Sequence, residues 1–229
     1  MGNRPPSPRQ RLREILRWRG FPLFVLLAVR EFLRPILYWH VFYIFDRDLA
    51  HEPLPEPYSS VDLEVKVYTK QMCVDRIITE LAALGELGRD EIESRLNRGD
   101  VVAIACASGE LAGYGWLGFS SGKVELAFGA TWIVHAHEAV RYGNFVSPKW
   151  RGRGIQSSVN AAVNSYAREH GITRALGSIS TLNTQSMSLA KHYSSASTMK
   201  VTLIRIRALK KTIIRTSVAP FESRFIRPK

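Results

Sequence analysis

The sequence has little cysteine and lacks the motifs that cysteine usually forms. Only Cys73 and Cys106 occur in 229 residues, which excludes a disulfide framework, and no CxxC or Cys/His cluster indicates a metal site. Reduced thiols of this kind are typical of the cytoplasm. Hydrophobic residues make up 45% of the chain, with ordinary glycine and proline counts, which excludes a disordered protein. We expect a cytoplasmic protein of one domain with an appendage, or of two small domains.

Long apolar runs are also missing. Residues 21–29 and 36–45 are apolar, but each is shorter than the roughly 20 residues of a membrane-spanning helix. Joining the two runs would bury three charges and Pro35, and no small-residue cleavage site marks a signal peptide. What remains is an arginine-rich amphipathic segment with aromatic side chains suited to a lipid headgroup region. The alternative is a helix pair that packs on the domain or on a homodimer partner.

Acidic residues are scarce at the two ends of the chain. Residues 1–35 carry a net charge of +6 and residues 200–229 carry +8, so the body at 36–199 is nearly neutral at −2. A nucleic-acid-binding domain usually has its basic surface on the core fold, with aromatic side chains interleaved. Two basic ends instead favour an anionic membrane surface or an acidic partner. We expect no specific nucleic-acid binding, and contact of residues 1–35 with the inner face of a membrane.

The body of the chain alternates between strand-like and helix-like patterns. Period-two alternation and helical spacing, separated by turn residues, predict the order β-α-α-β-β-β-β-α-β-α-β, an α/β fold. Strands are expected at 61–68, 101–107, 110–119, 123–134, 138–146, 172–180 and 199–209, and helices at 71–84, 89–100, 155–171 and 184–194. The predicted divisions are an amphipathic helical extension at 1–50, a proline-rich linker at 51–60, a domain at 61–207 and a basic tail at 208–229.

A glycine-containing turn, VSPKWRGRGIQ at 146–156, joins an expected strand to an expected helix. Backbone N–H groups at a helix start bind anions, and glycines let phosphate oxygens approach the backbone. Arg151 and Arg153 add positive charge. The turn is not a P-loop, because no GK[ST] follows, and Ser157 stands where GxGxxG requires its third glycine. The pattern therefore indicates an anion site, with a solvated basic turn as the alternative.

This run resembles the pyrophosphate-binding signature of the GNAT superfamily of acetyl-CoA-dependent N-acetyltransferases. That signature is Gln/Arg-x-x-Gly-x-Gly/Ala after a strand ending in Val-x-Pro, and five of its six positions agree with residues 151–156. Gln156 departs from it, because the family prefers a small residue there. The order of elements over 61–207 is also similar to the family, which implies a mixed, mostly antiparallel sheet flanked by helices.

A second stretch, LNTQSMSLAKHY at 182–193, resembles the family motif that begins the helix after the next strand. The resemblance implies that Asn183 binds the pantetheine arm and that Ser186 is the small residue near it. Ala190 stands where the family has the tyrosine that protonates the leaving thiolate, and Tyr193 is the nearby substitute. The residues assigned to acetyl-CoA, or to another acyl-CoA, are Phe145, Val146, Arg151, Gly152, Arg153, Gly154, Ile155, Gln156, Asn183 and Ser186.

The resemblance implies direct attack of an amine on the thioester, which requires oxyanion donors and a base. Backbone N–H groups at Phe145 and Val146 are the expected donors. Strand alternation would place His135 and His137 on one face and Glu138 on the other. The candidate bases are Glu125, His135, His137 and Glu138, and the aromatic residues that could shape an acceptor pocket are Tyr114, Trp116 and Tyr142.

The function that follows is an acyl-CoA-dependent N-acyltransferase for a small-molecule amine, with a membrane-linked or cell-envelope precursor as one candidate acceptor. The missing tyrosine at Ala190 leaves a non-catalytic acyl-CoA-binding or scaffold protein as the alternative.

Overall fold

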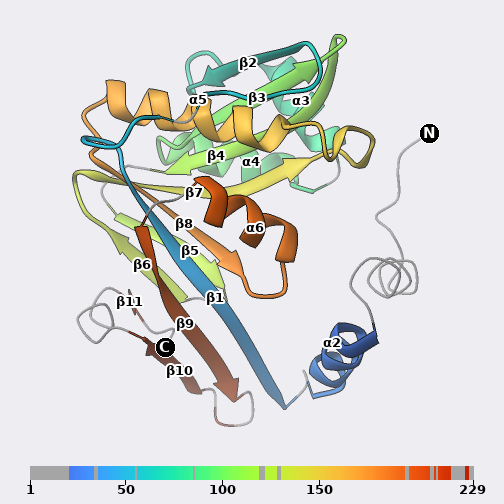
Figure 1. The fold of residues 1–229 in the computed structure, drawn as a ribbon, viewed down its shortest axis with the longest axis vertical. Coiled ribbons are helices and arrows are strands. Elements are labelled where there is room, and N and C mark those ends of the chain that lie inside the picture. Colours follow the sequence, from blue (N-terminus) through green and yellow to red (C-terminus); the bar gives the residue numbers. More distant parts are fainter. Residues whose placement is uncertain are drawn as a thin grey trace.

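The computed structural model describes residues 21–33, 36–54, 56–84, 86–118, 122–127, 130–193, 196–206, 209, 211–217 and 225–226 (Figure 1). Its elements are α2 (Phe21–Leu33), β1 (Leu37–Asp48), β2 (Leu63–Tyr68), α3 (Asp75–Ala83), α4 (Arg89–Asn97), β3 (Val101–Ala107), β4 (Glu110–Gly118), β5 (Gly122–Ala127), β6 (Ala130–Val134), β7 (Glu138–Val146), the 3₁₀ turn η1 (Pro148–Trp150), α5 (Ile155–Glu169), β8 (Arg174–Ser180), α6 (Thr184–Tyr193), β9 (Ala196–Ile206), β10 (Lys211–Thr216) and β11 (Phe225–Ile226).

The main sheet has eight strands in the order β10-β9-β1-β8-β7-β4-β3-β2. Neighbouring strands are antiparallel except for β7 and β8, which run parallel. A smaller sheet contains β11, β6 and β5. The predicted α/β class with a mixed, mostly antiparallel sheet is confirmed.

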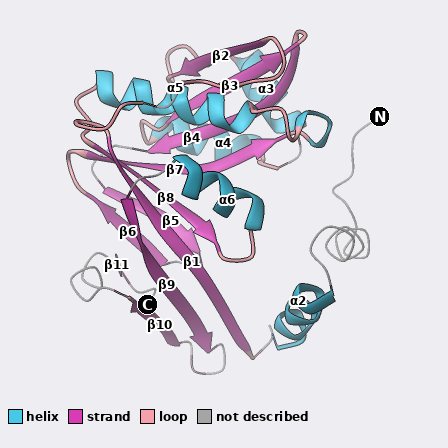
Figure 2. Cartoon of the chain, in the orientation of Figure 1, coloured by secondary structure: helices cyan, strands magenta, loops and turns pink. Residues whose placement is uncertain are grey.

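Helices cover both faces of the main sheet (Figure 2). α5 and α6 lie on one face, and α3, α4 and the small sheet lie on the other. α5 packs Val159, Val163 and Ala167 against fully buried alanines of the sheet, among them Ala139 and Ala175. Small side chains on the sheet let the helix backbone approach closely, which brings the N-terminal end of α5 near the end of β7.

The apolar run at 36–45, which the sequence analysis assigned to the extension, belongs to β1 in the middle of the main sheet. β1 pairs with β8 on one side and with β9 on the other. Phe42, Ile44 and Phe45 are each 3% exposed, so both faces of the strand are covered. A strand covered on both faces is apolar on both, and its sequence then lacks the alternation that identifies a half-buried strand.

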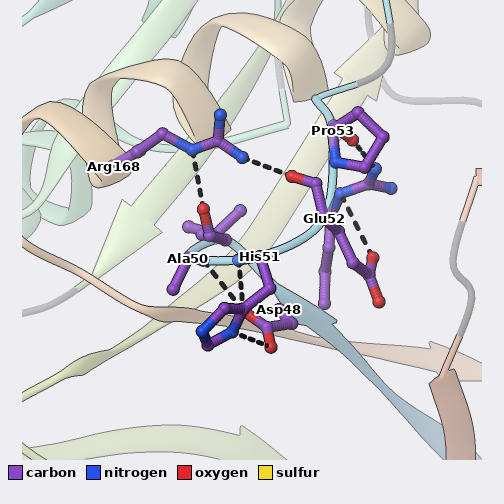
Figure 3. Close-up of polar contacts among 8 residues, drawn as sticks. Asp48, Ala50, His51, Glu52, Pro53 and Arg168 are labelled. Atoms are coloured by element: carbon purple, nitrogen blue, oxygen red, sulfur yellow. Dashed lines mark hydrogen bonds and ion pairs between the residues drawn. The ribbon is translucent and has the colours of Figure 1, made fainter.

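The proline-rich segment at 51–60 is attached to the domain rather than standing apart from it (Figure 3). Arg168 of α5 donates to the carbonyl oxygens of Leu49 at 2.7 Å and Glu52 at 2.5 Å. Arg47 donates to the carbonyl oxygen of Pro53 at 2.6 Å. These side-chain donors satisfy backbone groups of an irregular segment, which fixes its course over the end of α5.

Two other boundaries differ from the expected ones. Residues 211–216, placed in the basic tail by the sequence analysis, form β10 and extend the main sheet beside β9. The stretch at 123–134, expected as one strand, is the hairpin of β5 and β6. In the part of the chain that the structure describes, no helix combines the length and apolar character needed to cross a bilayer.

Candidate active site

The parallel strands β7 and β8 separate partway along their length. Their pairing runs from Glu138 opposite Arg174 to Arg141 opposite Gly177. Beyond that point, the rest of β7 pairs only with β4, and residues 178–180 of β8 pair only with β1. The backbone edges that face this divergence therefore have no strand between them, and they can bind an extended ligand.

The backbone N–H of Val146, in β7, faces the divergence. The N–H of Ser147 donates to the carbonyl oxygen of Ala112 on β4 at 2.9 Å. Because successive residues of a strand direct their backbone groups to opposite edges, the N–H and C=O of Val146 point away from β4, toward β8. Of the two predicted oxyanion donors, Val146 has this orientation, whereas the N–H of Phe145 points to β4.

The turn after β7 presents the start of α5 beside the divergence. Gly152 and Gly154 have φ angles of 77° and 82°, in the left-handed region that glycine adopts without strain. Gly154 is the N-cap of α5, and Ser158 makes the first helical bond back to its carbonyl oxygen at 3.2 Å. The N–H groups of the preceding positions, including Ile155 and Gln156, have no helical partner, so they form an anion-binding helix end.

Cationic side chains surround this helix end. Trp150 is buried under the turn, and the Arg153 guanidinium lies 5.2 Å from the centre of its ring. Lys149 lies 5.1 Å from the same ring and bonds Glu110 at 2.6 Å. Arg151 donates through Nε to the carbonyl oxygen of Val146 at 3.2 Å. These cations and the N–H groups of α5 together fit a pyrophosphate.

Gln156, the residue that departs from the family signature, turns away from the helix start. Its amide nitrogen donates to Oδ1 of Asn160 at 3.2 Å, one turn further along α5. In this arrangement the long side chain lies along the helix and leaves the backbone N–H groups of the first turn uncovered.

Asn183 and Ser186 lie at the start of α6, just after β8. Oδ1 of Asn183 accepts the N–H of Ser186 at 3.1 Å, which caps the helix. The structure therefore places them beyond the end of β8, across the divergence from the turn after β7. Ala190 follows one turn later in α6, and Tyr193 is its last residue, with a side chain outside the described set.

Three of the predicted bases, His135, His137 and Glu138, lie at the opposite end of β7. Glu138 begins β7, where it accepts Arg174 at 3.1 Å and the N–H of His135 at 3.2 Å. His135 and His137 are exposed in the turn before β7. The expectation that strand alternation places them on one face is wrong, because residues 135–137 connect two strands. Glu125 lies in β5, and its side chain is outside the described residues.

A polar cluster lies on the sheet face opposite α5. Sequence reasoning named its aromatic members, Tyr142 and Trp116, but missed the charged residues that contact them. The Tyr142 hydroxyl donates to Oδ2 of Asp100 at 2.5 Å, and Arg98 bonds the same oxygen at 3.1 Å. The Arg95 guanidinium stacks on the rings of Tyr142 and Trp116, at 4.8 and 5.2 Å from their centres. Asp100 had no sequence signal beyond its place after Gly99, because an Asp after a helix usually belongs to a solvated turn.

Comparison with known proteins identifies the class to which this fold and turn belong. The model of the acetyltransferase (GNAT) family matches residues 72–193, more than half of the chain. The chain therefore belongs to the GNAT family of acetyltransferases, as the motifs at 151–156 and 182–193 indicated. No curated protein matches the sequence significantly.

One solved structure shares the fold at low sequence identity, and two aminoglycoside acetyltransferases are similar at lower TM-scores. A conserved protein of unknown function from Staphylococcus epidermidis has a TM-score of 0.50 at 11% identity, covering 88% of this chain and 82% of its own. An aminoglycoside acetyltransferase from an uncultured soil metagenomic sample has a TM-score of 0.44 at 15% identity, covering 59% of this chain and 90% of its own. The aminoglycoside N-acetyltransferase AAC(6')-Iy, solved with CoA, has a TM-score of 0.45 at 19% identity, covering 60% of this chain and 90% of its own.

Proposed function

We propose that this protein is an acyl-CoA-dependent N-acyltransferase for a small amine. The observation that carries the proposal is the position of the α5 helix start, with Gly152 and Gly154, beside the end of the diverging pair β7 and β8. An acyl-CoA, probed first as acetyl-CoA, would place its pyrophosphate on the turn and its pantetheine arm between the strands. When bound, it supplies an activated thioester.

The residues of the chain hold and polarise the reacting group. Arg151 and Arg153 bind the pyrophosphate together with the N–H groups at the start of α5. The amide of Asn183 faces the pantetheine arm from the other side of the divergence. The N–H of Val146 is the candidate donor to the thioester carbonyl, where negative charge develops during attack.

The amine acceptor reaches the divergence from the face opposite α5 in this proposal. Tyr142 has apolar contacts with both core clusters on that face, one under α3 and α4 and one under the small sheet. The Asp100 carboxylate beside it is 6% exposed and provides negative charge for a protonated amine. A water between the amine and this carboxylate would accept the proton that the attack releases.

Calorimetric titration with acetyl-CoA tests the cofactor site. We expect micromolar-range binding by the full chain and at least a tenfold loss in the Arg151→Ala/Arg153→Ala double variant, since two phosphate contacts are removed. An Arg76→Ala/Arg89→Ala variant, in which two exposed arginines of α3 and α4 are replaced, is the matched control. Equal affinity of the double variant and the wild type would overturn the pyrophosphate assignment.

A turnover assay distinguishes an enzyme from a non-catalytic binding protein. The binding protein is the second candidate function because of Ala190. Ala190 occupies the position of the family's thiolate-protonating tyrosine. Release of free thiol is measured with acetyl-CoA across a panel of amines, including amino sugars of the cell-envelope type. Thiol release that depends on one amine supports the enzyme, whereas acetyl-CoA binding without amine-dependent release across the panel supports the binding protein.

We further propose that α2 places the protein on an anionic membrane. Phe21, Val25, Val29 and Phe32 recur at helical spacing on one side of α2 and are 41–83% exposed. The chain around them is basic, with eight arginines in residues 1–35 against two glutamates. An exposed apolar stripe in a basic segment matches an anionic lipid surface, where both the apolar contact and the charge attraction favour binding.

Vesicle flotation tests this placement with phosphatidylcholine vesicles that contain or lack phosphatidylglycerol. Val25→Ser/Val29→Ser/Phe32→Ser should lose binding to the anionic vesicles, whereas Met72→Ser/Val74→Ser, two exposed apolar residues before α3, should retain it. Flotation of the triple variant equal to that of the wild type would overturn the proposal. Sedimentation of the wild type and the triple variant then shows whether the apolar stripe of α2 is a homodimer contact instead.

A further inference from the structure

The strand β7 has a bulge at Gly143 and Asn144, inside the divergence. The pairing of β4 with β7 shifts its register here, so that these two residues stand opposite Gly115 alone. Gly143 has a φ angle of 57°, the left-handed conformation of a glycine bulge. The pairing of β7 with β8 ends before the bulge, at Arg141. A bulge changes the direction of the side chains that follow it, and here the first of these is Asn144.

The side chain of Asn144 lies on the α5 face of the sheet. A Cβ on Gly115 would be 2.6 Å from Oδ1 of Asn144 and 2.7 Å from Cγ1 of Val159 on α5. The absence of a side chain at Gly115 therefore makes room for the carboxamide beside the helix. Gly143 and Asn144 are exposed, whereas the other residues of β7 are buried or half-buried. The bulge is thus the part of the strand that a ligand can reach.

The carboxamide of Asn144 makes no hydrogen bond to any residue that the structure describes. It has one acceptor oxygen and two N–H donors, which are available to water or to a ligand. Its neighbours Val146 and Val159 are apolar and belong to the cluster under α5. A polar group therefore interrupts an apolar surface at this point of the divergence.

Asn144 lies on the path that an acyl chain would take. In the proposed function the pyrophosphate binds the turn after β7, and the N–H of Val146 binds the thioester carbonyl. The acyl chain then extends away from the turn, toward the start of β7. Asn144 is the next residue on the same face in that direction, roughly 7 Å from Val146 along the strand. An acyl chain of several carbons therefore reaches the carboxamide.

The carboxamide distinguishes short acyl groups from long ones. An acetyl group has one methyl beyond the carbonyl, so it leaves the carboxamide hydrated. A longer alkyl chain would displace that water without replacing its hydrogen bonds, which is unfavourable. From this geometry, and resting on the proposed acyltransferase function, we propose that Asn144 determines the specificity for the acyl donor by excluding long apolar acyl groups. Without the carboxamide, contact with Val146 and Val159 would favour such groups.

Calorimetric titration of the full chain with acetyl-CoA and with hexanoyl-CoA tests the proposal. The wild type should bind acetyl-CoA about tenfold more tightly, because hexanoyl-CoA covers an unpaired carboxamide. Asn144→Leu keeps the shape of the side chain and removes its polar atoms, so it should bring the two Kd values within about threefold or reverse their order. Asn97→Leu, which replaces an exposed asparagine at the end of α4, is the control and should keep the wild-type preference.

The ratio of the two Kd values is measured on one protein, so a partly unfolded variant does not change it. A purely structural role of Asn144 would weaken both donors equally in Asn144→Leu and leave the ratio at its wild-type value, which would overturn the proposal. Equal affinity of the wild type for the two donors would overturn this inference alone and leave the proposed function standing. A wild type that binds neither donor would overturn the proposed function itself.

Discussion

The hydroxyl of Tyr142 on β7 donates a 2.5 Å hydrogen bond to the carboxylate of Asp100, which follows α4. This bond ties the strand of the candidate site to the helix layer on the acceptor face. Asp100 is buried, and its Oδ2 has Arg98 as a second partner. The position of the carboxylate therefore depends on a residue in the middle of β7.

Replacing Tyr142 with Phe should destabilise the protein by about 2 kcal/mol, the usual cost of losing a hydrogen bond to a charged group. Urea unfolding measures the change. Tyr38→Phe is the comparison, because Tyr38 is a buried tyrosine on a different strand, β1. If the Asp100 carboxylate assists removal of the amine proton through a water, Tyr142→Phe should also lower kcat more than it changes KM for acetyl-CoA. A variant with wild-type stability would show that the bond is not formed in solution.

Alkaline pH should destabilise the fold through two phenols, the buried one of Tyr114 and the half-buried one of Tyr142. Burial raises the pKa of Tyr114 to about 12, and burial together with Asp100 raises the pKa of Tyr142 well above its ordinary value of 10.0. Above pH 10 the unfolded chain releases protons that the folded state keeps, so the free energy of unfolding falls as pH rises from about 10 toward 12.

Urea midpoints at pH 8 and at pH 11 test this dependence. The fall between the two values should be smaller in Tyr114→Phe and in Tyr142→Phe than in the wild type. An unchanged fall in both variants would contradict the raised pKa values.

The two left-handed glycines of the turn should respond differently to alanine. A Cβ at Gly152 meets nothing within 4 Å, so Gly152→Ala should cost only the backbone strain, about 1 kcal/mol. A Cβ at Gly154 would collide with the carbonyl group of Tyr58, so Gly154→Ala should cost about 3 kcal/mol. Denaturant unfolding of both variants checks the difference, and equal costs would place the segment at Tyr58 away from the turn.

Asn183 has a capping role and a proposed binding role, and substitution can separate the two. Its side-chain oxygen caps α6, and its amide nitrogen is the proposed donor to the pantetheine arm. Asn183→Ala should cost about 1 kcal/mol of stability, whereas Asn183→Ser should keep the cap. Both variants should bind acetyl-CoA several-fold more weakly, because both lack the amide. Wild-type affinity in Asn183→Ser would leave the residue with the capping role alone.

The ion network at the start of β7 should matter for stability and not for acyl-CoA binding. Arg174 bonds Asp46 and Glu138, and the side chain of Glu138 is 5% exposed. Arg174→Met leaves that buried carboxylate without its cation, which should cost about 3 kcal/mol. The Kd for acetyl-CoA, measured below the unfolding transition, should stay within about twofold. A larger change in Kd would connect this end of β7 to the cofactor site.

The conformation of the turn at 151–156 was predictable because it depends on local geometry. Gly152 and Gly154 indicate positive φ angles in the sequence itself, and the strand and helix on either side have clear periodicity. The assignment of these residues to acyl-CoA stays a prediction. The orientation of Gln156 was not predictable, because it depends on the bond to Asn160.

Features that depend on distant partners were harder to predict. The position of β1 follows from pairing with β8 and β9, which no local pattern encodes. His135 and His137 were placed on a strand because apolar residues continue on both sides of them, and only the turn between β6 and β7 shows otherwise.

The place of β1 also has a consequence for how the chain folds during synthesis. Val41 is made early, yet it bonds Thr181, which lies 140 residues later. β1 therefore leaves the ribosome long before its neighbours β8 and β9 are synthesised. Its apolar side chains stay exposed until those strands are available to pair with it. A chain shortened to the family region at 72–193 would lack this strand and leave the edge of β8 unpaired. Such a fragment should aggregate, even though it contains every residue proposed to bind the pyrophosphate.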